Sequence, residues 1–425
     1  MTSQSKKTNS PHLPTILLVT SGYHLYREYL LKMVAEHSNV WLFLDSEPNW
    51  QIPYIVGYTV VNTLDAQMMI EVARNLADDI KIDGVLCWDE IRMVETAKLA
   101  QALGLPSTDP ENVGRCRDKH LTRTFLAASG VPQATSILVS SIDEATKAAE
   151  TIGYPVIIKP RALGASYGVS LVNGAEQLNT AFEHAKTATE DGVPIYDQRV
   201  LVEEYMQGPE VSIDVAWVNG IMYPLFVARK VTGFFPHFEE IGHVVDSHDP
   251  LLEYTPFISV LEQAHKAVGF RNGITHTELR LTQTGPKIVE INARLGGDMI
   301  PYVGCIASGI NPGQVAVAVA CGQQPNVEKR HKRVAAIQFL YPENDAIADS
   351  VHINHAALPA SVDVAASLVS PGQKLLLPPA DHVSCRYAYL IVHGDNAQEC
   401  TATIESAVQA FTLKTKQLST VGGLN

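Results

Sequence analysis

A predicted β-hairpin carries the residues whose types and spacing point most clearly to chemistry. Its two strands are expected at residues 275–282 and 286–292. Because side chains alternate between the two faces of a strand, the apolar residues share one face and the polar residues share the other. The polar face carries His276, Glu278 and Arg280 on the first strand, and Glu290 and Asn292, followed by Arg294, on the second.

The glutamates of this hairpin are expected to form a magnesium site. A turn containing Gly285 places Glu278 directly across from Glu290. Facing carboxylates repel each other unless a cation or a proton lies between them. Mg²⁺ binds carboxylate and amide oxygens together with phosphate oxygens, and Asn292 supplies such an amide. The planar guanidinium of Arg294 suits a phosphoryl or carboxylate oxygen beyond. The alternative is an ordinary polar outer face.

A second segment is a strand that ends in lysine before a glycine-rich loop. Residues 156–158 are apolar, Lys159 follows, and Gly164 and Gly168 lie in the loop that leads to another strand. A buried strand rarely carries lysine unless an anion binds there, and glycines let backbone N–H groups approach phosphates. The segment is not a P-loop, because its lysine precedes the loop. It indicates phosphate binding, with an ordinary hairpin as the alternative.

A third segment, residues 201–210, is a strand that runs into a bend at Gly208. The backbone of such a strand can offer donor and acceptor groups to the edge of an adenine, and Glu210 can bind ribose hydroxyls. The alternative is the charged end of a strand.

Composition limits the class of protein. The chain has 425 residues, of which 46% are hydrophobic and 18% charged, which is ordinary for globular proteins. Its net charge of -13 disfavours binding to a nucleic acid backbone, which attracts basic surfaces. The apolar runs are too short to span a bilayer. Residues 1–12 lack the apolar core of a signal peptide, so we expect a cytoplasmic protein.

The six cysteines are scattered without CxxC spacing. We interpret them as buried thiols rather than as a metal cluster or a disulfide framework.

Strands and helices are expected to alternate in the N-terminal part. Strands are predicted at 15–20, 40–45 and 84–87, and helices at 24–36, 66–79 and 90–103. This order predicts a parallel sheet with helices on both faces. Residues 21–24, after the first strand, lack GxGxxG, so we expect a scaffold that contributes a wall of a site and no dinucleotide fingerprint.

The regular alternation of strands and helices ends at about residue 113. Helices are expected at 119–129, 175–190, 256–269, 311–321 and 398–411. Strands are expected within 153–160 and at 200–204, 211–218, 223–229, 333–341 and 383–393. The predicted organisation is a flexible tail at 1–12, an α/β domain at 13–112, a central domain at 113–326 with a lid at about 125–205, and a C-terminal α+β region at 327–425.

Taken together and in this order, the three segments resemble the ATP-grasp superfamily of carboxylate–amine ligases. The likeness spans about residues 113–325 and implies an ATP-grasp fold, of mixed α/β and α+β class, behind a Rossmann-like parallel-sheet domain. It implies that Lys119 and Lys159 hold the nucleotide phosphates under a loop that contains Ala165 and Ser166. It also implies that adenine is lined by Glu203, Glu204, Tyr205 and Met206, that ribose is bound by Glu210, and that two Mg²⁺ ions, or Mn²⁺, are bound by Glu278, Glu290 and Asn292.

One stretch narrows the resemblance. Residues 233–245 look like the substrate loop of the L-amino acid ligases, the dipeptide-forming branch, in which Glu240 and His243 would shape the amino acid pocket. Residues 294–297, Arg-Leu-Gly-Gly, are similar to that branch's contact with carboxylate and acyl phosphate. Some relatives carry a bulky residue where this chain has Asp298, so their acceptor preference does not transfer. The alternative for 233–245 is a plain lid.

The resemblance implies an ADP-forming ligase that joins a carboxylic acid, expected to be an amino acid, to the amine of a second amino acid through an acyl phosphate. Arg294, Gly296 and Gly297 would support the reacting acyl group, while His276 and Glu240 are candidate bases for the amine. The expected partners are small molecules, without nucleic acid or membrane, and a homodimer is open. The rivals are a biotin-carboxylase-like enzyme, a purine-pathway or D-alanine-type ligase, and a non-catalytic nucleotide-binding module.

Overall fold

The computed structural model describes residues 3–5, 13–164, 166–189 and 197–416. These residues form two compact units. The first comprises Met1–Thr135, Met206–Ala228 and Ser247–His331, and the second comprises Ser136–Tyr205, Arg229–Asp246 and Lys332–Asn425. Each unit is therefore assembled from three separate stretches of chain, and each is described by itself below.

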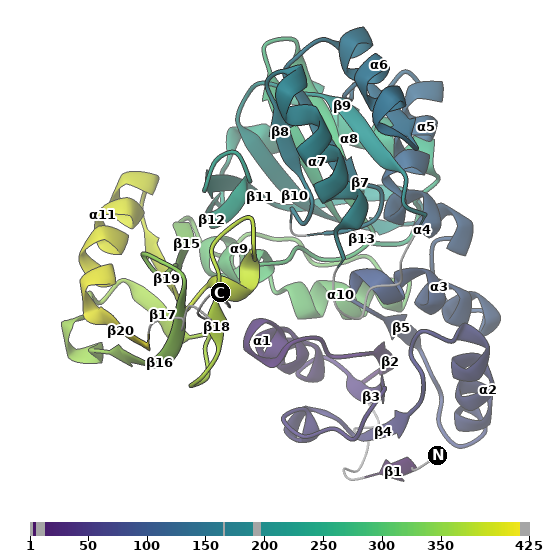
Figure 1. The fold of residues 1–425 in the computed structure, drawn as a ribbon. Coiled ribbons are helices and arrows are strands. Elements are labelled where there is room, and N and C mark those ends of the chain that lie inside the picture. The colour runs from purple at the N-terminus through teal and green to yellow at the C-terminus, as the bar shows by residue number, and fades with distance from the viewer. Residues whose placement is uncertain (1–2, 6–12, 165, 190–196, 417–425) are drawn as a thin grey trace, which may run out of the picture. The chain divides into compact units, whose positions relative to one another are not determined.

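The first unit begins with a mainly parallel sheet (Figure 1). Its buried strands are apolar and β-branched, as parallel strands covered on two faces require. The strand order is β1-β4-β3-β2-β5, with β1 (Ser3–Ser5) antiparallel to β4 at the edge. The other strands are β2 (Thr15–Val19), β3 (Asn39–Leu44), β4 (Gly57–Val60) and β5 (Gly84–Leu86).

Helices cover this sheet as predicted. Met69 and Ala73 from α2 and Leu99 and Ala100 from α3 pack against Phe43 and other strand residues. Helix α1 contacts β3, and the later helix α10 contacts β5. The helices are α1 (His24–Ala35), α2 (Ala66–Ala77), α3 (Met93–Ala102) and α10 (Pro312–Ala320). The predicted parallel sheet is confirmed, although β4 was missed.

The rest of the first unit contains the predicted hairpin, which is formed by strands β13 and β14. Strands β14, β13, β10 and β11 are neighbours in that order, and the apolar face of α8 buries Phe257, Leu261 and Val268 in the core that contains Ile288 and Ile291. The elements are α4 (Pro110–Arg117), α5 (Lys119–Ala128), β10 (Glu210–Val218), β11 (Ile221–Gly233), α8 (Thr255–Val268), β13 (Gly273–Thr282), β14 (Gly285–Asn292) and α9 (Ile300–Ser308). Strand β11 ends in the second unit.

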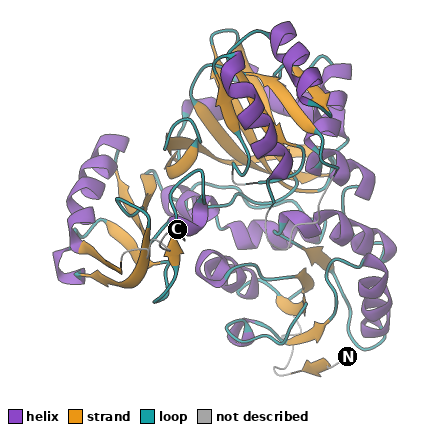
Figure 2. Cartoon of the chain, in the orientation of Figure 1, coloured by secondary structure: helices purple, strands orange, loops and turns teal. Residues whose placement is uncertain are grey.

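The second unit contains a four-stranded antiparallel sheet in the order β6-β9-β7-β8. Helices α6 and α7 lie over this sheet (Figure 2), and Ala145 and Phe182 on them pack against Ile158 and Val202 of the strands. The elements are β6 (Ser136–Val139), α6 (Ile142–Ile152), β7 (Val156–Pro160), β8 (Ser170–Val172), α7 (Ala175–Thr187) and β9 (Val200–Glu204). Strand β6 and helix α6 were not predicted.

The C-terminal part of the second unit continues the order β11-β12-β15-β19-β17 and adds a small sheet, β18-β16-β20. Its elements are β12 (Glu239–Asp246), β15 (Val334–Leu340), β16 (Ala346–Ile353), β17 (Val362–Ser367), β18 (Lys374–Leu375), β19 (Ala388–Gly394), α11 (Ala397–Ala407) and β20 (Phe411–Lys416). Two sequence-based boundaries are corrected. Residues 233–245 are largely a strand rather than a loop, because β12 pairs with β15. The last helix stops at Ala407.

Short 3₁₀ segments occur at Ile52–Tyr54, Glu90–Arg92, Pro250–Leu252, His355–Ala357, Val383–Cys385 and Val408–Ala410.

All six cysteines are free, three of them buried and three partly buried. Among the described residues, no single helix has the length and apolarity to cross a membrane, and one pair, Ile300–Ser308 with Pro312–Ala320, passes together by length and composition but is bent by 108°.

Candidate functional site

The register of the hairpin brings the predicted metal ligands together. Glu278 lies directly opposite Glu290, and His276 lies opposite Asn292. A bulge after Glu278 lets Leu279 pair with Ile288, so the apolar face stays buried despite the extra residue. The opposition of the two glutamates, expected from side-chain alternation and the turn, is confirmed.

Cationic groups of the first unit surround these two carboxylates. The Nζ atom of Lys119 is 2.9 Å from Oε1 of Glu290, and Nε2 of His276 is 3.6 Å from Oε1 of Glu278. Lys119 is placed there by α5, whose first turn is capped by the carboxylate of Asp118. Both glutamate side chains keep 17–19% of their surface exposed, so their oxygens can be reached by a ligand. Two carboxylates and one amide are a donor set that fits Mg²⁺.

Asp214 is a buried residue of this region that sequence reasoning missed. It faces His276 across the β10–β13 pair, and its Oδ1 is 2.6 Å from Nδ1 of that histidine. Burial alone would lower the pKa of His276, but the hydrogen bonds and charges of Asp214 and Glu278 raise it to about 9. The carboxylates on both ring nitrogens thus favour the protonated form of His276, and its suggested role as a base stays a prediction. The available signal was an aspartate inside a mostly apolar strand, β10, whose other polar residues are Glu210 and Ser212.

The segment after the hairpin, residues 294–297, is held in place by charged groups. The Nε atom of Arg294 is 2.6 Å from Oε2 of Glu90. Burial opposes the charge of Arg294, but Glu90, Glu290 and Glu278 outweigh burial and raise the pKa of the guanidinium above its ordinary value. Arg294 therefore remains a cation beside the hairpin carboxylates. Glu90, which lies about 200 residues earlier in the chain, was not predicted.

The backbone of Gly296 is held on both sides. Its N–H donates to Oδ2 of Asp214 over 3.0 Å, and its carbonyl accepts from Nη1 of Arg27 over 3.1 Å. A Cβ atom at this position would lie 2.9 Å from Nδ1 of His276, so only glycine fits here. The Gly296 N–H, suggested as an oxyanion contact, donates to Asp214, so an acyl oxygen would share this hydrogen with the carboxylate. Gly297 has open space around it, since an added Cβ would meet no atom within 4 Å, and its contact with the acyl group stays a prediction.

In the second unit, Lys159 meets a buried carboxylate. Its Nζ atom is 2.6 Å from Oε2 of Glu203, and both side chains are less than a tenth exposed. Strands β7 and β9 place the two residues side by side, since Ile157 pairs with Glu203 and Lys159 with Leu201. The buried charge of Lys159 is thus balanced within the unit. The predicted phosphate and adenine residues of these strands are neighbours.

The remaining predicted nucleotide residues are placed as follows. Glu204 ends β9, and the ring of Tyr205 lies 6.2 Å from that of Phe238. Ser166 adopts a left-handed φ of 57°, while Ala165 lies outside the described residues. In the first unit, Met206 is buried, and Oε2 of Glu210 is 2.7 Å from Nη2 of Arg280, so any ribose contact of Glu210 would share this arginine.

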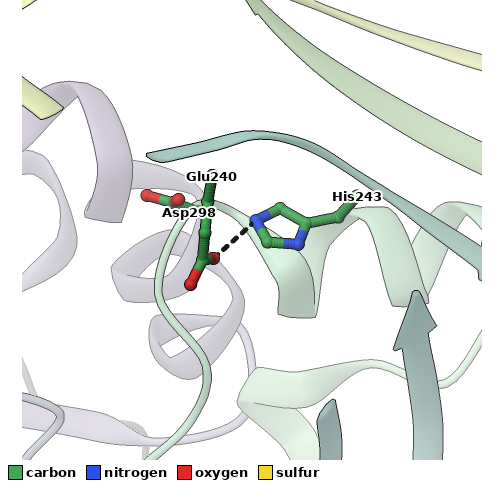
Figure 3. Close-up of side chains that lie close together, drawn as sticks. All are labelled: Glu240, His243 and Asp298. Atoms are coloured by element: carbon green, nitrogen blue, oxygen red, sulfur yellow. Dashed lines mark ion pairs between the residues drawn. The ribbon is translucent and has the colours of Figure 1, made fainter. Parts of the chain in front are cut away.

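The predicted substrate residues Glu240 and His243 lie on β12. Figure 3 shows the carboxylate of Glu240 pointing to the imidazole of His243, with Oε2 and Nε2 3.3 Å apart. The Nζ atom of Lys230, from the adjacent β11, is 2.7 Å from Oε1 of the same glutamate. Lys230 was missed, and it balances the charge of Glu240. In the first unit, Asp298 has a left-handed φ of 45° in the turn before α9.

Comparisons with known proteins match one part of the chain to a protein family. A family model described as the ATP-grasp domain matches residues 152–302. An alanine–anticapsin ligase from Bacillus subtilis (strain 168) is 22% identical over 384 residues, which cover 82% of this chain and 80% of that protein.

Two solved structures show the same fold. The L-amino acid ligase from Bacillus licheniformis superposes with a TM-score of 0.79 at 20% identity, over 97% of this chain and all of that one. Phosphoribosylglycinamide synthetase from Anaerococcus prevotii gives a TM-score of 0.71 at 15% identity, over 95% and 100% of the two chains.

Proposed function

Because residues 152–302 match the ATP-grasp domain model and the chain shares the fold of an L-amino acid ligase, we propose that it is an ADP-forming ligase that joins a carboxylic acid to the amine of an amino acid. The observation that carries the proposal is the hairpin: Glu278 opposite Glu290 and Asn292 opposite His276, with Lys119 at 2.9 Å from Glu290. This is an oxygen donor set flanked by cations, as ATP with magnesium requires.

The reaction proceeds in two steps. An oxygen of the donor carboxylate attacks the γ-phosphorus of ATP, the bond between that phosphorus and the β–γ bridging oxygen breaks, and ADP leaves. The amine nitrogen of the acceptor then attacks the acyl carbon, the bond from that carbon to the phosphate oxygen breaks, and the amine loses a proton. Such transfers need positioning and charge neutralisation more than covalent chemistry by the protein.

The chain's own residues supply that positioning. Glu278, Glu290 and Asn292 would hold the metal, which supplies positive charge to the phosphate oxygens when bound. Lys119 and Lys159 would bind phosphate oxygens, and Arg294 would balance charge on the transferred phosphoryl group. Glu203 to Met206 would line the adenine, Ser166 and Ala165 would lie in the loop over the phosphates, and Glu210 would bind ribose.

The amino acid would be recognised around Glu240. This carboxylate has Lys230 at 2.7 Å and His243 at 3.3 Å, so a substrate ammonium would share it with Lys230, while a substrate carboxylate would bind the lysine. Gly297 would support the acyl oxygen, and Asp298 would affect the choice of acceptor. The similarity to an alanine–anticapsin ligase favours two amino acid substrates over a purine-pathway substrate.

Release of ADP in the presence of ATP and magnesium tests the proposal. The full chain is incubated with all pairs of amino acids, and products are identified by mass spectrometry. ADP together with the mass of a condensed dipeptide is the expected result. ADP release only with phosphoribosylamine and glycine, with bicarbonate, or with paired D-alanine would replace the proposal by a rival, and nucleotide binding without turnover on any substrate would favour the non-catalytic module.

A further inference from the structure

A closed polar cluster lies in the second unit outside the residues discussed above. Its centre is the carboxylate of Glu239, which is 1% exposed. The hydroxyl of Tyr341 donates to Oε1 over 2.8 Å, Nδ1 of His382 lies 3.0 Å from Oε2, and Nη2 of Arg386 lies 3.3 Å from Oε1. Burial raises the pKa of Tyr341 far above its ordinary value, so the hydroxyl keeps its proton and donates.

Stability alone does not account for such a cluster, because its charged groups lose their hydration on folding. Arg386 is 2% exposed and His382 is 1% exposed, so a full ion pair is withdrawn from water. Buried ion pairs are often no more stabilising than apolar residues of similar volume, whereas removal of one partner leaves an uncompensated charge. The guanidinium of Arg386 also stacks 3.9 Å above the ring of Phe339, which fixes its plane. The arrangement therefore favours a role in holding specific atoms in place.

One side of the cluster holds the glycine-rich loop. Tyr167 lies between Gly164 and Gly168, and its ring meets the ring of His382 edge-on at 5.1 Å. Its hydroxyl donates to Oδ1 of Asp381 over 3.2 Å. The loop that would cover the phosphates is thus attached to the C-terminal part of the same unit through one aromatic side chain.

The other side holds the strand of Glu240. Nη2 of Arg386 donates to the carbonyl of Glu240 over 2.8 Å, and Nε of the same arginine donates to the hydroxyl of Tyr341 over 2.9 Å. The amide of Gln338 donates to the next carbonyl, that of Ile241, over 2.9 Å. The backbone that carries the proposed amino acid contact is therefore fixed by residues more than 90 positions further along the chain.

We propose that Glu239, His382 and Arg386 are positioning residues that connect the glycine-rich loop to the strand of Glu240. Through Tyr167 they set the loop that covers the nucleotide, and through the Glu240 carbonyl they set the amino acid contact. This assigns the C-terminal region a role in aligning the two substrates. The inference rests on the proposed ligase function.

The first test uses Tyr167 variants of the full chain and the binding of ADP with magnesium, measured by calorimetry. Tyr167→Phe keeps the ring and removes the hydroxyl, so its Kd for ADP should rise about threefold. Tyr167→Ala removes both contacts, and its Kd should rise about tenfold, the sum expected of one hydrogen bond and one aromatic pair. An unchanged Kd in Tyr167→Ala overturns the part of the inference that concerns the loop.

The second test compares two histidines of the C-terminal region. His382→Gln should raise the KM for ATP about tenfold, since a buried hydrogen bond to a charged group is lost. His393→Gln is the matched control, because His393 pairs with Asp363 in a partly exposed site and should leave the KM unchanged. Equal effects of both variants, or a loss of activity accounted for entirely by a lower folded fraction, overturn the positioning role.

The third test is a double-mutant cycle with Tyr167→Phe and Arg386→Lys. Lysine keeps the charge but cannot reach Tyr341, Glu239 and the Glu240 carbonyl together, so the single variant should raise the KM for the amino acid about tenfold. The effects of residues in one network are not additive. The rise in the KM for the amino acid in the double variant should therefore be smaller, by threefold or more, than the product of the rises in the two single variants. Additive effects overturn the connection.

These readouts separate the inference from the proposed function. If the unaltered chain ligates no pair of amino acids, the proposed function fails, while ADP binding by the Tyr167 and His382 variants still tests the attachment of the loop. If ligation occurs and the variants change neither ADP binding nor either KM, the inference alone fails.

Discussion

The hairpin β13–β14 and the cluster around Glu239 are two ways of placing carboxylates inside one protein. In the hairpin, Glu278 faces Glu290, and each keeps nearly a fifth of its side chain exposed. Around Glu239, a single carboxylate receives three donors and is closed to water. Paired, accessible acids are suited to bind a cation that arrives with a ligand. A single, fully satisfied acid is suited to hold its neighbours.

The largest effect is expected from Glu290→Gln. Loss of this carboxylate should lower the rate of ADP release about 1000-fold, because removal of a group that stabilises charge in a transition state typically costs about 3–4 kcal/mol. The measurement is ADP release at saturating magnesium. Glu262→Gln, on the exposed side of α8, is the control and should retain full activity. A Glu290→Gln enzyme that is folded and active would exclude the metal role.

A large loss of stability is expected from Glu239→Gln. The substitution leaves Arg386 without its buried counter-charge, so the free energy of unfolding should fall by about 3 kcal/mol. Chemical denaturation measures it. Asp363→Asn removes a partly exposed partner of His393 and should change stability by no more than about 0.5 kcal/mol. Equal stability losses in the two variants would remove the distinction between closed and open carboxylates.

Asp214 lies beside the hairpin but is as buried as Glu239. Its substitution therefore tests whether a buried carboxylate next to the hairpin affects catalysis or only the stability of the fold. Asp214→Asn weakens two hydrogen bonds, to His276 and to the Gly296 N–H. Since hydrogen bonds to charged groups contribute about 1.5–3 kcal/mol, kcat should fall about 10- to 100-fold. Steady-state kinetics measures this. Ser212→Ala, on the same strand, should be nearly neutral. Full activity of Asp214→Asn would show that Asp214 has a structural role and no role in catalysis.

The smallest effect concerns a histidine outside both clusters. Burial lowers the pKa of His265 from 6.5 to about 4, and the neutral ring bonds to the carbonyl of Leu261 and to Thr275. Between these pH values the unfolded chain binds more protons than the folded chain, so this residue makes stability fall as pH decreases. The slope is about 1.4 kcal/mol per pH unit.

Denaturation of the unaltered chain and of His265→Gln at pH 7.5 and pH 5.5 measures the contribution of this histidine. Between pH 7.5 and pH 5.5, the free energy of unfolding of the variant should fall by about 1.4 kcal/mol less than that of the unaltered chain. Identical losses would show that His265 does not stay neutral in the folded protein.

Local signals were sufficient where an element and its partner are close in sequence. The hairpin and its polar face follow from a turn of a few residues and from strand alternation, whereas the bulge after Glu278 sets the register that brings Glu278 opposite Glu290. The parallel sheet of the N-terminal domain was equally predictable from the order of its elements. Strand β12 was not, because Gly242 and His243 interrupt its apolar pattern and its pairing with β15 depends on residues nearly 100 positions away.

The sequence by itself determined the hairpin with its polar face and the order of strands and helices in the N-terminal sheet, because residue type and alternation act over short stretches of chain, and its resemblance to the ATP-grasp superfamily supplied the fold. Only the tertiary structure decided which charges meet: Glu90 with Arg294, Asp214 with His276, Lys230 with Glu240 and Arg386 with Glu239. The physical reason is that a buried charge must find a partner wherever the folded chain brings one within reach, and no local pattern encodes that distance.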